Sequence, residues 1–173
     1  MSQDRKLTER EIDDIVVAQA DDPSAWEDEI PVQRKRWRVN PSRIELAAKF
    51  FVLSALHRIG ANAALATGQS ESVDAVVITP DGSTLTIQVK ALTGSTRWRV
   101  QDIRAQRNHF VVFVCFVSEV HNPQVAPEVY VVDSNALRDL VERERLVEVQ
   151  WSDLGERLNA REAWYQLAPA TAA

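Results

Sequence analysis

Residues 110–117 read Phe-Val-Val-Phe-Val-Cys-Phe-Val and are almost continuously apolar. A strand with one face in water alternates apolar and polar residues, because successive side chains point to opposite faces of the sheet. A run without this alternation is typical of a strand that is covered on both faces. We therefore expect a sheet with further layers packed against it, and the elements around this run must supply those layers.

A strong helix signal precedes the strands. Ser42 and Glu45 have the spacing of a capping box directly after Pro41, and Gly60 stands where a left-handed residue commonly ends a helix. Between these ends the apolar residues repeat at helical spacing: Ile44, Ala48, Phe51, Ala55 and Ile59. We expect a helix from about residue 42 to residue 59.

The remaining elements are mainly strands. Two β-branched runs are joined by Pro80-Asp81-Gly82, which indicates a hairpin. The expected strands are 61–66, 73–79, 84–90, 110–117 and 128–132, followed by a helix from Ser134 to about 145 and another over 152–158. This order predicts the α/β class, with a mixed β-sheet flanked by helices.

The length of the hairpin loop decides which side chains share a face. A two-residue loop of Asp81 and Gly82 would send Asp74 to the face opposite Gln88. A three-residue loop over 80–82, with Gly82 left-handed, pairs Asp74 with Gln88 instead. Proline suits the first position of such a turn, so we expect the three-residue form.

Polar residues gather on one face of the strand over 84–90. Gln88 and Lys90 are two residues apart and project together, and the hairpin returns Asp74 alongside them. A carboxylate and a second oxygen ligand suit a hard divalent cation, which neutralises charge that builds on a phosphate. A lysine ammonium beside them can stabilise the same charge.

This constellation resembles the PD-(D/E)xK nuclease superfamily, which includes many restriction endonucleases and archaeal Holliday-junction resolvases. Glu45 in a first helix, then Asp74, then Gln88-Val89-Lys90 carry the resemblance, which covers roughly residues 41–135. It implies a restriction-endonuclease-like fold and cleavage of DNA with Mg²⁺ or Mn²⁺. Asp74 and Gln88 would bind the metal, Glu45 would supply a helix carboxylate, and Lys90 would assist the attacking water.

Two positions depart from the superfamily pattern. Val73 stands where proline is common, and Gln88 replaces an acidic residue. A Gln-x-Lys variant resembles the Mrr-like restriction enzymes, although an amide oxygen binds Mg²⁺ less strongly than a carboxylate does. Glu45 also has a second interpretation, as the third helical residue of the capping box.

These features lead to two functional expectations. The first is a metal-dependent endodeoxyribonuclease, more in keeping with defence or mobile-element biology than with metabolism. The second is a catalytically silent binding or regulatory subunit with the same fold. The resemblance further implies a homodimer, since many such nucleases dimerise to cut two strands.

Charge is distributed unevenly along the chain. The net charge is −7 over residues 1–30, +7 over 31–107 and −5 over 108–173. A basic middle segment suits contact with phosphate, and an acidic segment serves either solvation or a protein partner. We expect residues 1–40 to form an acidic N-terminal helix, within 7–20, and a linker, and residues 41–173 to form the nuclease-like domain.

Two basic segments are interleaved with tryptophan. One contains Arg97, Trp98 and Arg99, and the other contains Arg34, Lys35, Arg36 and Arg38. Such segments suit phosphate contacts together with stacking on bases. Equally, the tryptophan can cover a sheet edge while the arginines extend to water.

Several function classes are not indicated. No run of about 18 apolar residues predicts a membrane helix, and the N-terminus does not resemble a signal peptide. The single cysteine and the three histidines show no zinc-ligand spacing. We expect a cytoplasmic protein that does not enter the membrane.

The charge distribution generates a prediction about DNA binding. Deleting residues 1–30 should tighten binding to DNA at low salt, because their carboxylates compete with phosphate for the basic middle segment. The gain should shrink as salt rises, when both interactions are screened. Titration of labelled duplex DNA at two salt concentrations measures the effect. An unchanged low-salt affinity would contradict the idea and favour a partner-binding role for the segment.

Overall fold

The computed structural model describes residues 8–10, 14, 17, 40–66, 72–94, 97–101, 103–117 and 119–168. The chain divides into two units, Met1–Arg38 and Val39–Ala173. In the first unit, residues 9, 10, 14 and 17 are helical and lie within the helix expected over 7–20. The linker and the four basic residues Arg34, Lys35, Arg36 and Arg38 lie outside the described residues.

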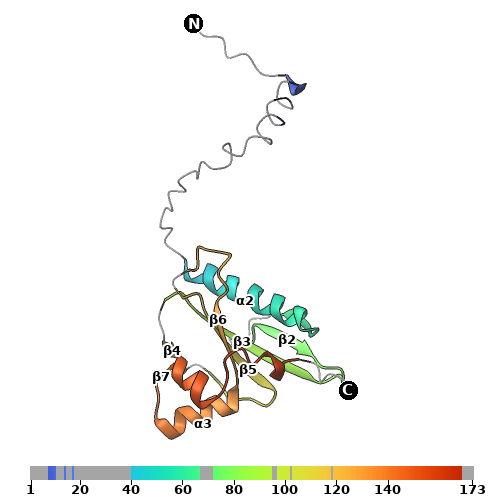
Figure 1. Ribbon diagram of the computed structural model, residues 1–173. Helices are drawn as coiled ribbons and strands as arrows, with labels where there is room; N and C mark the ends of the chain where they lie inside the picture. Colours follow the sequence, from blue (N-terminus) through green and yellow to red (C-terminus); the bar gives the residue numbers. More distant parts are fainter. Residues whose placement is uncertain are drawn as a thin grey trace. The chain divides into compact units, whose positions relative to one another are not determined.

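The second unit is built on a five-stranded sheet with the order β1-β2-β3-β5-β6 (Figure 1). β3 and β5 are parallel, and the other neighbours in this sheet are antiparallel. The expected mixed sheet is therefore confirmed. Its strands are β1 (Asn62–Leu65), β2 (Ala75–Ile78), β3 (Thr84–Leu92), β5 (His109–Cys115) and β6 (Glu128–Asp133).

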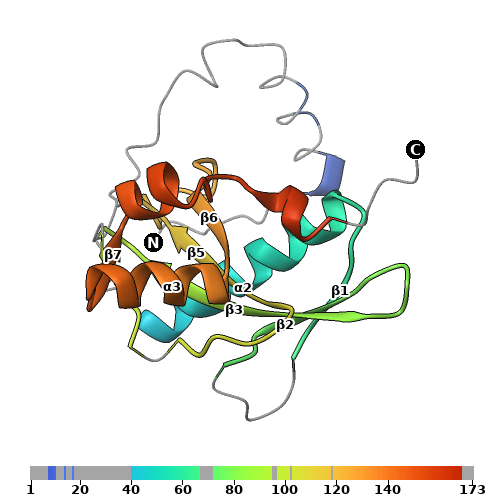
Figure 2. The same ribbon diagram turned by 90° about the horizontal axis from the view of Figure 1, so that it is seen from below.

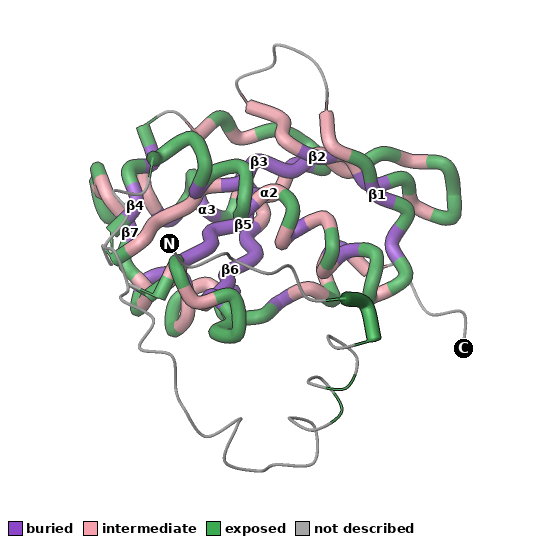
Figure 3. Tube along the Cα trace, turned by 90° about the horizontal axis from the view of Figure 1, so that it is seen from above, coloured by how far each residue is buried: buried purple, intermediate pink, exposed green. Residues whose placement is uncertain are grey.

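Helices cover the two faces of this sheet (Figures 1 and 2). On one face α2 (Pro41–Arg58) packs its Ala48 and Val52 against Ile87 of β3. On the other face α3 (Ser134–Glu144) packs Leu137 against Phe113 of β5. β5 is buried almost throughout, as Figure 3 shows, and the apolar run at 110–117 thus predicted its two-sided burial correctly.

Smaller elements complete the second unit. A two-stranded antiparallel sheet of β4 (Arg97–Arg99) and β7 (Glu148–Gln150), which we did not predict, lies beside the main one. A π-helical segment, Asp153–Arg157, and a 3₁₀ turn, Trp164–Gln166, follow β7. None of the helices within the described ranges is long and apolar enough to cross a bilayer.

The outer edge of β6 is paired with the segment that follows the π-helix. The Val131 N–H donates to the Ala160 carbonyl at 2.9 Å, and the Glu162 N–H donates to the Val129 carbonyl at 3.0 Å. Tyr130 and Arg161 form the bridge between these two bonds. Two outward backbone groups in the middle of β6 are thereby satisfied, which hinders pairing of this edge with another chain.

The start of α2 differs from the capping box expected at Ser42. Asn40 is the N-cap, and its side-chain oxygen accepts a hydrogen bond from the Ser42 N–H at 3.0 Å. Pro41 therefore occupies the first helical position, where its fixed φ and missing N–H are favourable. Glu45 lies beyond the first turn, so the capping interpretation of Glu45 was wrong. The helix ends as predicted, with Gly60 at φ +81°.

α3 begins at Ser134 as expected, and its N-cap is the preceding residue, Asp133. Asp133 accepts hydrogen bonds from the N–H groups of Asn135 and Ala136 at 2.8 and 3.1 Å. The Ser134 hydroxyl instead donates to the Gln106 carbonyl and accepts from the Gln106 N–H, both at 3.1 Å. A carboxylate is a strong cap, and Ser134 is thereby available to anchor the loop before β5.

The hairpin between β2 and β3 has the predicted three-residue loop. The Thr79 N–H donates to the Ser83 carbonyl at 2.9 Å, and Gly82 is left-handed with φ +82°. Asp81 accepts hydrogen bonds from the Thr79 hydroxyl and from the N–H and hydroxyl of Ser83. These bonds, that of Thr79 first, lower the pKa of Asp81 from 3.8 to about 2. The loop therefore fixes the register that aligns β2 with β3.

The observed cap leads to a test of where α2 begins. Replacing Asn40 with alanine should lower the free energy of unfolding by about 1 kcal/mol, because the Ser42 N–H loses its acceptor. Ser42→Ala is the matched control and should have little effect, since Ser42 contributes its backbone N–H. Urea unfolding of the two variants measures both values. A larger loss for Ser42→Ala would restore the capping box at Ser42.

Candidate active site

Asp74 lies immediately before β2, where the ladder with β3 ends. Ala75 pairs with Ile87, yet the Asp74 N–H also donates to the Ile87 carbonyl, at 2.7 Å. Two consecutive residues opposite one partner form a β-bulge, which commonly redirects a side chain at a functional site. Here the Asp74 carboxylate extends along β3, and its Oδ2 accepts the Val89 N–H at 2.7 Å.

The second carboxylate oxygen of Asp74 contacts a lysine that the sequence did not single out. Lys49 Nζ lies 2.6 Å from Asp74 Oδ1, and the two side chains are 32% and 16% exposed. Lys49 is held in place by α2, since its neighbour Ala48 is fully buried in the core against β3. Its position four residues after Glu45 was the available signal, because residues at that spacing share a helix face.

Gln88 and Lys90 flank the backbone group that holds Asp74. Ile87 and Val89 face α2, so by the alternation of a strand Gln88 and Lys90 face the other side of the sheet. There they lie beside Val111 and Phe113 of β5. Gln88 is 3% exposed, while Lys90 is half-buried. The predicted register holds as far as Ala75, but the bulge at Ile87 replaces the expected pairing of Asp74 with Gln88. Asp74 instead reaches the Val89 N–H and Lys49 of α2, whereas Gln88 and Lys90 face the side of the sheet away from α2.

Glu45 occupies the exposed surface of α2, one turn before Lys49. Its carboxylate is not used in capping the helix, since Asn40 performs that role. Glu45 and Lys49 share a helix face by their spacing, and Lys49 reaches Asp74. Direct contact of Asp74 with Gln88 or Glu45 stays a prediction.

The donor types at this place suit a hard cation. Within the described ranges no group of three His, Cys, Asp or Glu side chains is arranged to hold a metal ion. Asp74 and Glu45 offer carboxylates and Gln88 an amide oxygen, which are donors that Mg²⁺ accepts. Asp74 moreover holds a cation already, in the form of the Lys49 ammonium. The donor atoms of these residues are therefore of the types that bind a divalent metal.

The basic segment at β4 divides into two kinds of side chain. Trp98 is 3% exposed and packs edge-to-face on Phe113 and Tyr130, with ring centroids 5.2 and 6.2 Å away. Arg97 and Arg99 on either side are exposed, and Arg99 lies 4.0 Å from Glu148 of β7. The burial favours the interpretation in which the tryptophan packs in the core and the arginines extend to water.

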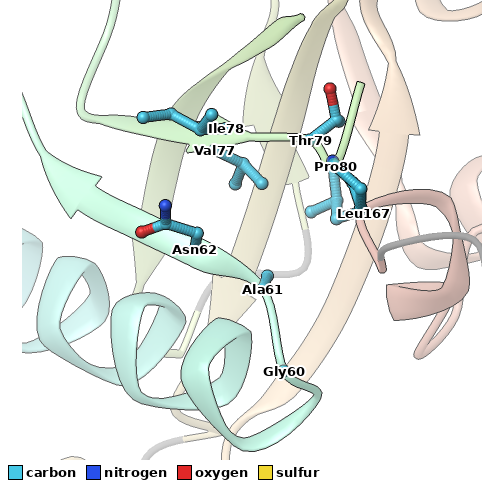
Figure 4. A pocket seen from close by; sticks show the side chains of 8 residues that line it. All are labelled: Gly60, Ala61, Asn62, Val77, Ile78, Thr79, Pro80 and Leu167. Carbon is cyan, nitrogen blue, oxygen red and sulfur yellow. The ribbon is translucent and has the colours of Figure 1, made fainter. Parts of the chain in front are cut away.

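A pocket lies at the other end of the hairpin, between the start of β1 and the Pro80 turn (Figure 4). Its lining includes Asn62, Ile78 and Leu167 and contains no titratable side chain. General acid or base chemistry requires such a group. The pocket is therefore not a second candidate for catalysis.

Comparison with known proteins adds a structural likeness. No family model matches the sequence, and no curated protein matches it. Among solved structures, a bacterial homing endonuclease, I-Ssp6803I, is similar with a TM-score of 0.47 and 17% identity. The match covers 74% of this chain and 93% of that chain. At this level of similarity, any functional assignment depends on the residues of this chain.

The contact between Lys49 and Asp74 predicts a measurable coupling in stability. Lys49→Met keeps the apolar stem, and Asp74→Asn keeps an oxygen that can accept the Val89 N–H. Each change removes one charge, so a double-mutant cycle isolates the ion pair. We expect a coupling free energy of about 1 kcal/mol in urea unfolding, near the upper end for partly exposed pairs.

Lys49→Arg serves as the control for this cycle. It retains the charge and should retain most of the coupling with Asp74. A coupling of zero would show that the pair contributes nothing to the stability of the fold.

Proposed function

We propose that the second unit is a nuclease that hydrolyses phosphodiester bonds in DNA with Mg²⁺ or Mn²⁺. One observation carries the proposal: a bulge at the start of β2 directs the Asp74 carboxylate to the Val89 N–H of β3, the residue between Gln88 and Lys90. A carboxylate thus lies against the backbone of the strand that carries an amide oxygen and an ammonium. This is the arrangement that the PD-(D/E)xK resemblance implies.

Each residue has a distinct task in this proposal. Asp74 and Gln88 would hold the metal, with Glu45 as a further carboxylate. When bound, the metal would neutralise the negative charge that develops on the phosphate. Lys90 would orient the attacking water and stabilise the same charge through its ammonium. Gln88 is buried, so its side chain has little freedom and is fixed before substrate binds.

Arg97 and Arg99 supply cations for the DNA backbone. Both side chains are exposed, and the short pairing of β4 with β7 fixes the strand that carries them. The buried ring of Trp98 anchors that strand to the core. Contacts of this kind are with phosphate and do not read sequence.

A second function is favoured by the contact between Lys49 and Asp74. An internal ammonium neutralises the carboxylate without a metal, and Gln88 brings no negative charge of its own. A domain with these features can bind DNA or a protein while leaving the phosphodiester intact. This is the silent binding or regulatory subunit, whose partner would engage the acidic segment over residues 1–30.

Cleavage of plasmid DNA by the purified full chain tests the proposal. Asp74→Asn should abolish cleavage, because it removes the metal-binding charge. Lys90→Ala should lower the rate by about 10²-fold or more, as loss of a group that positions and polarises water does. It should leave metal affinity nearly unchanged, since lysine is not a ligand. Calorimetry with Mg²⁺ and Mn²⁺ separates these two effects.

Gln88→Glu distinguishes the two functions. It restores the acidic residue of the commoner motif, and it should tighten Mg²⁺ binding if Gln88 already faces the metal. An inactive wild type with an active Gln88→Glu variant would establish the silent subunit. If neither protein binds a divalent cation, the nuclease mechanism is wrong.

A further inference from the structure

Lys49 places a permanent positive charge at the site proposed for the metal. Its Nζ lies 2.6 Å from Asp74 Oδ1, a distance that combines an ion pair with a hydrogen bond. α2 holds the lysine close, because Ala48 and Val52 on either side of it are fully buried. The packing of the helix therefore keeps the backbone of Lys49 within reach of Asp74.

Both oxygens of Asp74 are engaged in this arrangement. Oδ2 accepts the Val89 N–H, which belongs to the strand backbone and cannot leave without opening the sheet. Oδ1 accepts from Lys49, whose side chain is 32% exposed and can swing into water. A divalent cation that binds Asp74 therefore meets the ammonium first. Two like charges on one carboxylate repel, so the lysine has to move away from Oδ1.

We propose that Lys49 is an internal counter-cation that competes with the divalent metal for Asp74. The inference rests on the proposed metal site and adds its regulation. In the metal-free protein the ammonium neutralises Asp74 and keeps the half-buried carboxylate in place. On metal binding it leaves Oδ1, and the energy of the broken ion pair is subtracted from the metal's binding energy. Lys49 thereby sets the metal concentration at which the site fills.

Removing the charge of Lys49 should therefore tighten metal binding. We expect Lys49→Met to raise the affinity for Mn²⁺ roughly fivefold, the equivalent of one partly exposed ion pair. Lys49→Arg keeps the charge and should resemble the wild type. Arg43→Met removes an exposed cation from the same helix and controls for the change in net charge. Isothermal titration calorimetry of the full chain with MnCl₂ measures all four proteins.

Thermal unfolding supplies a second readout that does not depend on catalysis. A cation that binds only the folded state stabilises it in proportion to its affinity. A sub-saturating concentration of Mn²⁺ should thus raise the melting temperature of Lys49→Met more than that of the wild type. If Lys49→Met is too unstable to study, Lys49→Gln tests the same loss of charge with a polar side chain.

The outcomes separate this inference from the nuclease proposal. Tighter Mn²⁺ binding in Lys49→Met and Lys49→Gln, with Lys49→Arg and Arg43→Met unchanged, supports the competition. If the wild type binds Mn²⁺ and Lys49→Met binds it equally or more weakly, the competition is overturned, while the metal site and the nuclease proposal stand. Binding in Lys49→Met alone means that the lysine excludes the metal from the native site. No binding in any protein, Lys49→Met included, removes both proposals.

Discussion

The parallel pairing of β3 with β5 determines how the rest of the molecule is arranged. It joins seven residue pairs, from Thr86 and His109 to Leu92 and Cys115. Parallel neighbours need a long connection and are covered on both faces. The residues of these strands are therefore expected to be apolar on both faces, and a buried polar residue needs a specific explanation. α2 covers one face and α3 the other. Gln88 is the buried polar exception on β3, and it lies next to the candidate site.

The site exists because β2 is shorter than β3. β2 begins at Ala75, opposite Ile87, whereas β3 continues to Leu92, so the backbone of β3 beyond Ile87 lacks β2 as a partner. Asp74 fills part of this gap with its side chain, by accepting the Val89 N–H. A carboxylate that replaces a backbone carbonyl in a ladder has a second oxygen to spare. That oxygen is what makes the start of β2 able to hold a cation.

Local signals in the sequence predicted much of this fold. The apolar run at 110–117, the Pro80-Asp81-Gly82 turn and Gly60 each act within a few residues, so the burial of β5, the hairpin register and the end of α2 followed from them. The capping residues were misplaced because Asn40 and Pro41 together form a better start than Ser42. The competition between adjacent caps is decided by small free-energy differences.

The interactions that the sequence did not predict are non-local. The pairing of β4 with β7 joins segments about fifty residues apart, and the strands are too short to carry an alternation of their own. Whether Trp98 is buried depends on this pairing. The contact of Lys49 with Asp74 depends on the rotation of α2 about its axis, which the packing of Ala48 and Val52 decides. The four residues of the resemblance were placed by their order, by strand alternation and by the hairpin, and none of these signals includes Lys49.

The segment over 160–162 that pairs with β6 has a consequence for the order in which the protein is completed. A chain is synthesised from its N-terminus, so α2 and the hairpin emerge from the ribosome before β6, and this segment emerges after it. Until then β6 has an unpaired outer edge and exposes apolar residues such as Val129 and Val131, which are buried in the folded protein. Such an edge favours association with other strands. The segment that closes the sheet is thus made after all five of its strands. Nascent chains stalled before residue 160 should therefore depend more on chaperones than chains stalled shortly after it.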